Sequence, residues 1–153
     1  MNKSHQKPHS QDLRKHRYSQ PGQVYHITTT TLSRRAVFKE IYLGREVVKC
    51  LYHPERDAST LAYVVMPDHM HWLMQLGEQK SLSSEIQQMK RVSSMHVNRL
   101  NGRSGSIWQS GFHDHAVRKD EDLVRIARYI ITNPVRAGLV KRIEDYSLWN
   151  AVW

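Results

Sequence analysis

Cysteine is almost absent from this chain, and its scarcity limits the kind of site that the protein can build. The 153 residues include a single cysteine, Cys50. One cysteine excludes an internal disulfide and any zinc finger that is built from cysteines. A metal site must therefore use histidine, carboxylate or amide ligands, and we expect Cys50 to be a small buried residue.

Long apolar runs are missing as well. No stretch approaches the roughly 18 apolar residues that a membrane-spanning helix needs, and the polar start of the sequence lacks the apolar segment of a secretory signal. We therefore expect a cytoplasmic protein with no membrane partner. The sequence also shows no internal repeat, and no linker after residue 22 is long enough to separate two domains.

Acidic residues are few relative to basic ones. The chain has 14 Asp and Glu against 23 Lys and Arg, which gives a formal net charge of +9. Such an excess favours association with polyanions, and nucleic acid is the leading partner class. We expect a flexible basic arm over residues 1–22, with Arg14 and Arg17 as DNA contacts, followed by a single domain over residues 23–153.

Hydrophobic periodicity predicts a mixture of strands and helices. Alternating apolar and β-branched residues predict strands over 24–32, 60–66, 69–76 and 112–117. Apolar residues at helical intervals predict helices over 40–53, 81–100 and 122–133. The second and third strands are joined by Pro67 and Asp68, a pair typical of a tight reversal. This order predicts an α+β fold with a ferredoxin-like, split βαβ antiparallel sheet and helices packed mainly on one face.

Two histidines separated by one apolar residue, His69-Met70-His71, lie on the third predicted strand. Alternate side chains of a strand share a face, so both imidazoles point to the same side while Met70 points to the other. This geometry offers two nitrogen ligands to one divalent cation. An isolated pair of this kind is also compatible with polar residues on a solvated face.

Tyr129 lies off the apolar stripe of the last predicted helix. At roughly 100° per residue, one stripe is formed by Leu123, Ile126, Ala127, Ile130 and Ile131. Asn133 follows Tyr129 by one turn on the same side of the helix. A phenol is a weak nucleophile because its reference pKa is near 10, so attack on phosphate needs a nearby cation or base. His69, His71 and Asn133 could hold such a cation.

Five motifs in a fixed order carry a resemblance that covers nearly the whole chain from Arg17 onward. They occupy residues 17–22, 66–71, 107–109, 112–118 and 128–140. In this order they resemble the REP-associated tyrosine transposases, the domesticated branch of the single-tyrosine HUH (His-hydrophobic-His) endonuclease superfamily. The HxH pattern alone is a weak signal, whereas the ordered set is specific.

The resemblance implies cleavage and joining of single-stranded DNA beside a folded, REP-like hairpin. It implies that Tyr129 attacks the scissile phosphate, stays joined to the 5′ side as a phosphotyrosine and releases a free 3′ hydroxyl. It further implies Mg²⁺ or Mn²⁺ bound by His69, His71 and Asn133, although mobile-element relatives often carry Gln where this chain has Asn133. A monomer is expected for the domesticated branch, whereas the mobile-element relatives are dimers.

Basic and polar residues outside this centre are the predicted DNA contacts. The excess positive charge makes the basic edge of helix 81–100 a candidate stripe for phosphate. Trp108 either stacks on a base or anchors the core. His113 and His115 are expected to form hydrogen bonds near the site, and His26 to be structural. The predicted DNA contacts are Arg14, Arg17, Lys90, Arg91, Arg99, Arg103, Trp108, Gln109, His115, Arg118, Arg128 and Arg136.

Two other functions remain open at this level. The same sheet topology serves RRM-like nucleic-acid-binding modules without catalysis, which display aromatic residues on their central strands where this chain has His69 and His71. A metal-assisted phosphodiesterase that uses water would form no protein-linked intermediate. Metal dependence of strand cutting separates the first alternative from an enzyme, and a covalent adduct separates the second from a tyrosine nuclease.

Overall fold

A five-stranded antiparallel sheet forms the centre of the computed structural model, which describes residues 19–153. The strands, in sheet order, are β4 (His113–Ala116), β1 (Val24–Thr30), β3 (His69–Gln75), β2 (Ser59–Val65) and β5 (Trp149–Ala151). The helices are α2 (Ile41–Leu51), α3 (Leu82–Asn101), α4 (Leu123–Ile131) and α5 (Asn133–Arg136), with 3-10 turns at Leu32–Arg34, Val37–Lys39 and Ile143–Asp145. All strand pairs are antiparallel, so the predicted α+β antiparallel sheet is confirmed.

The middle of the sheet is the predicted hairpin of β2 and β3, with β1 on the other side of β3. The turn is closed by a hydrogen bond from the Met66 N–H to the His69 carbonyl, at 2.8 Å. Across β1, Thr28 is the partner of His71 and Thr30 the partner of His69. Because β3 is flanked by strands on both sides, the backbone that carries the two histidines is fixed by two ladders of hydrogen bonds.

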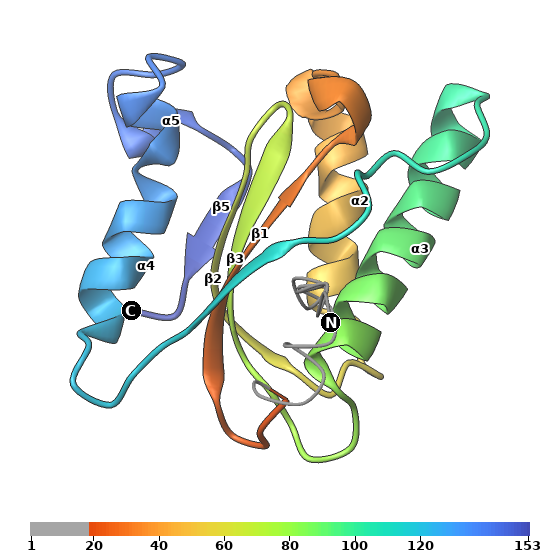
Figure 1. The fold of residues 1–153 in the computed structure, drawn as a ribbon. Coiled ribbons are helices and arrows are strands. Elements are labelled where there is room, and N and C mark those ends of the chain that lie inside the picture. Colours follow the sequence, from red (N-terminus) through yellow and green to blue (C-terminus); the bar gives the residue numbers. More distant parts are fainter. Residues whose placement is uncertain (1–18) are drawn as a thin grey trace, which may run out of the picture.

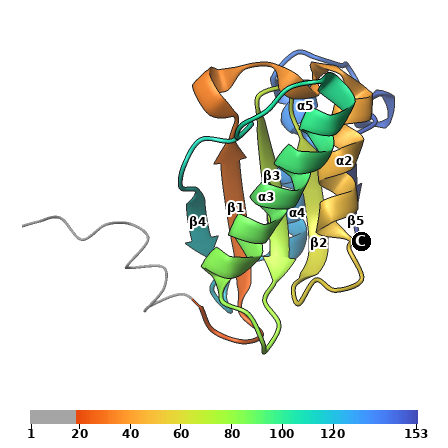
Figure 2. The same cartoon turned by 90° about the vertical axis from the view of Figure 1, so that its right-hand side faces the viewer.

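One face of the sheet is buried beneath α2 and α3, as Figures 1 and 2 show. Tyr25 and Ile27 of β1 and Met70 and Trp72 of β3 are completely buried in this core. Around the two histidines they alternate with polar residues, namely His26, Thr28, His69 and His71, which face the other side of the sheet. The predicted pleat is therefore present, with Met70 turned away from its histidine neighbours.

The opposite face is covered by α4, which lies on the other side of the sheet from α2 and α3 in Figure 1. Ala127 and Ile130 of α4 pack with Ala62, Val64 and Leu73 of the sheet in a second apolar cluster. The prediction that helices pack mainly on one face is confirmed by the two longest helices, and α4 adds a helix on the other face. The reason is physical: α4 has an apolar stripe of its own, and the sheet offers it an apolar strip over β2 and β3.

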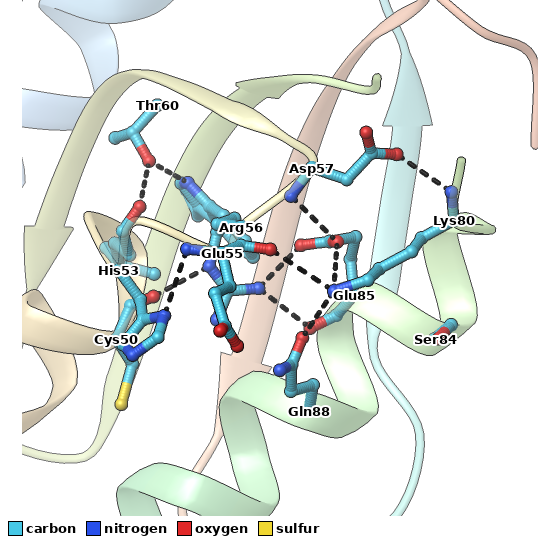
Figure 3. Close-up of polar contacts among 12 residues, drawn as sticks. Cys50, His53, Glu55, Arg56, Asp57, Thr60, Lys80, Ser84, Glu85 and Gln88 are labelled. Carbon is cyan, nitrogen blue, oxygen red and sulfur yellow. Dashed lines mark hydrogen bonds and ion pairs between the residues drawn. The ribbon is translucent and has the colours of Figure 1, made fainter. Parts of the chain in front are cut away.

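A buried ion pair joins α3 to the segment before β2 (Figure 3). Arg56 and Glu85 have side chains that are 4% and 0% exposed, and their nearest charged atoms lie 2.6 Å apart. The Arg56 Nε also donates to the Cys50 carbonyl at 2.7 Å, and its guanidinium lies 5.5 Å from the Trp72 ring centroid. A Glu85 oxygen accepts from the Asp57 N–H at 3.3 Å. The pair is thus enclosed by partners rather than by water.

One boundary and one strand differ from the sequence-based prediction. Residues 19–22 were assigned to the flexible arm, yet the Ser19 hydroxyl accepts from the Leu82 N–H at 3.2 Å and the Gly22 N–H donates to the Leu76 carbonyl at 2.8 Å. The folded domain therefore begins before residue 23. Strand β5 was not predicted, because three residues are too short to show a period. Within the described range, no helix is long and apolar enough to cross a membrane.

Replacing Arg56 by Met should lower the free energy of unfolding by about 3–5 kcal/mol, because the buried Glu85 would lose its nearest charged partner and keep only Lys80, at 4.0 Å. The matched control is Lys49→Met, which removes a lysine that is 69% exposed and pairs with Glu46. That change should cost less than about 1 kcal/mol. Urea unfolding measures both values, and equal losses would contradict the assigned role of the buried pair.

Candidate active site

His69 and His71 project from β3 to the sheet face that α4 partly covers. Both side chains are half-buried, and Met70 between them is buried on the other face. The two ring centroids lie 5.1 Å apart with an interplanar angle of 87°. The predicted convergence of the two imidazoles is therefore present in the structure.

Each imidazole uses its Nδ1 atom for a contact within the protein. The Nδ1 of His69 lies 2.7 Å from Oδ1 of Asp68. The Nδ1 of His71 lies 3.0 Å from Nε2 of His26 and 3.1 Å from the Thr28 hydroxyl, both on β1. A metal-binding histidine commonly donates its other ring N–H to such a partner, which fixes the ring and its tautomer. The arrangement leaves the Nε2 atoms as the donors for a cation.

The surroundings of His71 keep its ring neutral. Burial lowers the pKa of His71 to about 3, and the positive charges of His26, His69 and Arg136 act in the same direction. Burial also lowers the pKa of His26, assisted by His115. A neutral imidazole is the form that binds metal, so His71 is ready to act as a ligand at neutral pH.

The donor set fits a divalent cation that completes its shell from elsewhere. Among residues 19–153, no group of three or more His, Cys, Asp or Glu residues could hold a metal ion. Two imidazoles would therefore be joined by oxygen ligands from an amide, a DNA phosphate or water. Asn133 is half-buried at the start of α5, just after α4 ends. Its role as the third ligand stays a prediction.

Tyr129 stands on the outer side of α4 and is 60% exposed. The helix begins at Asp122, whose side chain accepts hydrogen bonds from the backbone N–H groups of Val124 and Arg125. Its buried side is formed by Ala127 and Ile130, with the other members of the predicted stripe packed around them. The structure thus places the phenol where a large substrate can reach it.

Arg136 of α5 connects this tyrosine to the histidines. Its guanidinium carbon lies 3.9 Å from the centroid of the Tyr129 ring, and its Nη2 donates to the Tyr129 carbonyl at 2.6 Å. Its Nη1 donates to the Thr132 hydroxyl. The same positive charge acts on His71. Because α4 packs on the face to which the histidines project, Tyr129 and the imidazole pair lie on one side of the sheet, and Arg136 is in direct contact with Tyr129.

Two of the predicted DNA contacts have other roles in the structure. Trp108 is 2% exposed, packs against Phe38 with the two rings tilted by 44°, and donates from Nε1 to the Ser93 hydroxyl at 2.9 Å. It is the core anchor, and the base-stacking alternative is wrong because neither ring face is open. The Lys90 ammonium donates to the Gln109 carbonyl at 2.8 Å and to the Gly111 carbonyl. Lys90 therefore fixes the 109–111 segment, a contact that a helical wheel does not reveal.

The remaining predicted contacts are distributed over several elements. His115 and Arg118 share Glu121, with His115 Nε2 at 3.0 Å and Arg118 Nε at 3.6 Å from its Oε1. Arg14 and Arg17 lie outside the described residues. The exposed positions are Arg91, Arg99, Arg103, Gln109, His115, Arg118, Arg128 and Arg136.

Two open grooves lie on opposite faces of the sheet and meet the same connecting segment. The first, of about 470 Å³, runs along α3 and includes Arg91, Ser106 and other polar residues. The second, of about 200 Å³, lies between β1 and residues 109–113 and includes Thr28, the neighbour of His71. Residues 105–113 thus border both grooves at the β4 edge of the sheet.

Comparison with known proteins defines the family. The family described as "Transposase IS200 like" matches residues 19–133, a span that includes both histidines and Tyr129. A Haemophilus influenzae protein assigned as a REP-associated tyrosine transposase is 31% identical over 139 residues, which cover 82% of this chain and 77% of the relative. The chain belongs to the REP-associated tyrosine transposases of the IS200-like family. It is therefore a DNA-processing enzyme.

Two further relatives agree with this assignment. The Escherichia coli K12 REP-associated tyrosine transposase is 35% identical over 93 residues, covering 60% of this chain and 53% of the relative. A solved structure of a REP-associated tyrosine transposase bound to a REP hairpin is 28% identical and superimposes with a TM-score of 0.69. The match covers 87% of this transposase and 79% of that chain.

The low pKa of His71 predicts how folding responds to acid. The unfolded imidazole takes up a proton near pH 6.5, whereas the folded one does so only near pH 3. The unfolded state therefore binds more protons between these values, and the free energy of unfolding falls as the pH drops from 6.5 to 3.

His71→Asn should show a smaller fall than the wild type, measured by urea unfolding at pH 7 and pH 4. NMR should show an unchanged His71 ring across this range in the folded protein. A His71 resonance that titrates near pH 6.5 would contradict the structure.

Proposed function

We propose that this transposase cuts and rejoins single-stranded DNA beside a hairpin through a covalent bond between Tyr129 and a backbone phosphate. The proposal depends on one observation above all: an exposed phenol on α4 shares a side of the sheet with two imidazoles whose Nδ1 atoms are held by neighbouring side chains. The family assignment supports DNA processing, and the solved relative bound to a REP hairpin supports a hairpin as the partner.

In the first step, the Tyr129 oxygen attacks the scissile phosphorus and the bond from phosphorus to the 3′ oxygen breaks. The phenol loses a proton and the departing 3′ oxygen gains one, so the products are a 5′-phosphotyrosine and a free 3′ hydroxyl. A 3′ hydroxyl of another strand can reverse the reaction and join the strands. Because one phosphodiester replaces another, no external energy source is needed.

His69 and His71 would hold Mg²⁺ or Mn²⁺ through their Nε2 atoms, with Asn133 as a third donor. The bound cation supplies Lewis-acid polarisation of the phosphoryl oxygens and a fixed position for the phosphate. Asp68 and Thr28 hold the two rings by Nδ1, so their part is to orient the ligands before the cation arrives.

The two grooves suggest a path for the DNA around the β4 edge of the sheet. Arg91 borders the groove on α3, on the face opposite to the histidines, and Thr28 and Thr30 border the groove beside them. Residues 105–113 lie between the two grooves, and Lys90 holds part of this segment in place. A hairpin bound along α3 could therefore continue as a single strand into the histidine side.

Tyr129→Phe should abolish covalent attachment to a hairpin oligonucleotide and change its affinity by no more than about twofold, because only the nucleophilic oxygen is removed. A denaturing gel with labelled DNA reports the adduct, and fluorescence anisotropy reports affinity. An adduct that persists in the variant would exclude Tyr129. Cutting without any adduct would instead identify water as the nucleophile.

Loss of the metal site should remove cleavage together with cation binding. His69→Ala or His71→Ala should abolish the Mn²⁺ signal in titration calorimetry, and Asp68→Ala should weaken Mn²⁺ binding by about 10–100-fold. Asp145→Ala removes an exposed carboxylate from the Ile143–Asp145 turn and serves as the control. Excess chelator should stop cleavage by the wild type. Undiminished cutting in chelator would argue against the cation.

A further inference from the structure

We propose that Arg136, at the end of α5, is the positioning residue for the nucleophile and holds the Tyr129 ring in place. The proposal builds on the tyrosine chemistry above and concerns a residue that sequence reasoning had assigned to DNA contact. Arg136 lies three residues beyond the end of the matched span at residue 133.

The first support is the way the guanidinium is fixed. Two of its N–H groups are used locally: Nη2 donates to the Tyr129 carbonyl at 2.6 Å, and Nη1 donates to the Thr132 hydroxyl. The Thr132 hydroxyl in turn donates to the Arg128 carbonyl at 2.7 Å. The guanidinium is planar, and two bound acceptors fix its orientation. It therefore cannot turn without losing both hydrogen bonds.

The second support is the contact with the ring itself. The guanidinium carbon lies 3.9 Å from the Tyr129 ring centroid, well inside the range of a cation–π interaction. Tyr129 is 60% exposed and has little packing to restrict its side-chain rotamer. The arginine therefore supplies the restraint that the core does not, since it is bonded to the backbone of the residue whose ring it covers.

The third support is the sign of the charge. The guanidinium, fixed 3.9 Å from the ring centroid, also places positive charge beside the group that attacks the phosphate in the proposed reaction. The Arg136 guanidinium thus orients the exposed Tyr129 ring and also supplies positive charge beside it. An arginine that only bound phosphate would have no need of the two bonds to α4 and its C-terminal turn.

The test separates positioning from DNA affinity. Arg136→Met should slow adduct formation by about 10–100-fold in single-turnover reactions at saturating hairpin DNA and Mn²⁺, because misplacement of a nucleophile has effects of this size. Hairpin affinity, measured in a Tyr129→Phe background with and without Arg136→Met, should change by less than about twofold. Arg136→Lys should recover part of the rate, since it keeps the charge and loses the fork.

Two matched variants complete the comparison. Thr132→Val removes one acceptor of the guanidinium and should slow adduct formation by a smaller factor, about threefold. Arg142→Met removes the same charge from an exposed arginine that pairs with Glu144, and it should leave the rate unchanged. An unchanged rate in Arg136→Met, or a loss confined to affinity, would overturn the positioning role and leave a phosphate contact.

NMR of the Tyr129 ring tests the contact with Arg136 independently of the proposed reaction. With ¹³C-labelled tyrosine and assignment by Tyr129→Phe, Arg136→Met should shift the Tyr129 ring resonance while Arg142→Met should not. If the wild type forms no Tyr129-dependent adduct but the ring shift occurs, the reaction is wrong and the contact is real. If the adduct forms and the ring does not respond, the positioning role is wrong.

Discussion

The antiparallel pairing of β1 with β3 is the constraint on which the site depends. It places Thr28 opposite His71 and brings His26 within 3.0 Å of the same ring. Because side chains alternate along a strand, a slip of one residue would turn both histidines of β3 into the apolar core and Met70 out of it. The completely buried Met70 and Trp72 therefore secure the register that the polar face needs.

The two faces of the sheet have different roles in the structure. The face under α2 and α3 supplies the large core and the buried Arg56–Glu85 pair, while the other face is only partly covered by α4. This partial cover keeps the imidazoles half-buried and their Nδ1 contacts intact, yet leaves the neighbouring groove open. A transposase has to admit a long polymer, and an incompletely covered sheet face allows that without unfolding.

Local patterns in the sequence predicted most of the fold, and contacts between distant segments account for what was missed. The strand of the histidines and the apolar stripe of α4 follow from periods of two and 3.6, which a single segment reveals. Trp108 could not be assigned, because its burial depends on Ser93 and Phe38 from other elements. Likewise, the basic edge of α3 suggested a phosphate contact for Lys90, whereas its ammonium binds carbonyls 19 and 21 residues away.

His26 and His71 are 45 residues apart along the chain, so their contact forms only when distant segments come together during folding. The β2–β3 hairpin closes a short loop, whereas β1 must close a longer one to reach β3 and so loses more conformational entropy. A chain in which only the hairpin had formed would display the two histidines with Asp68 alone to orient them. The contacts that orient the His71 ring are thus complete only once β1 has paired with β3.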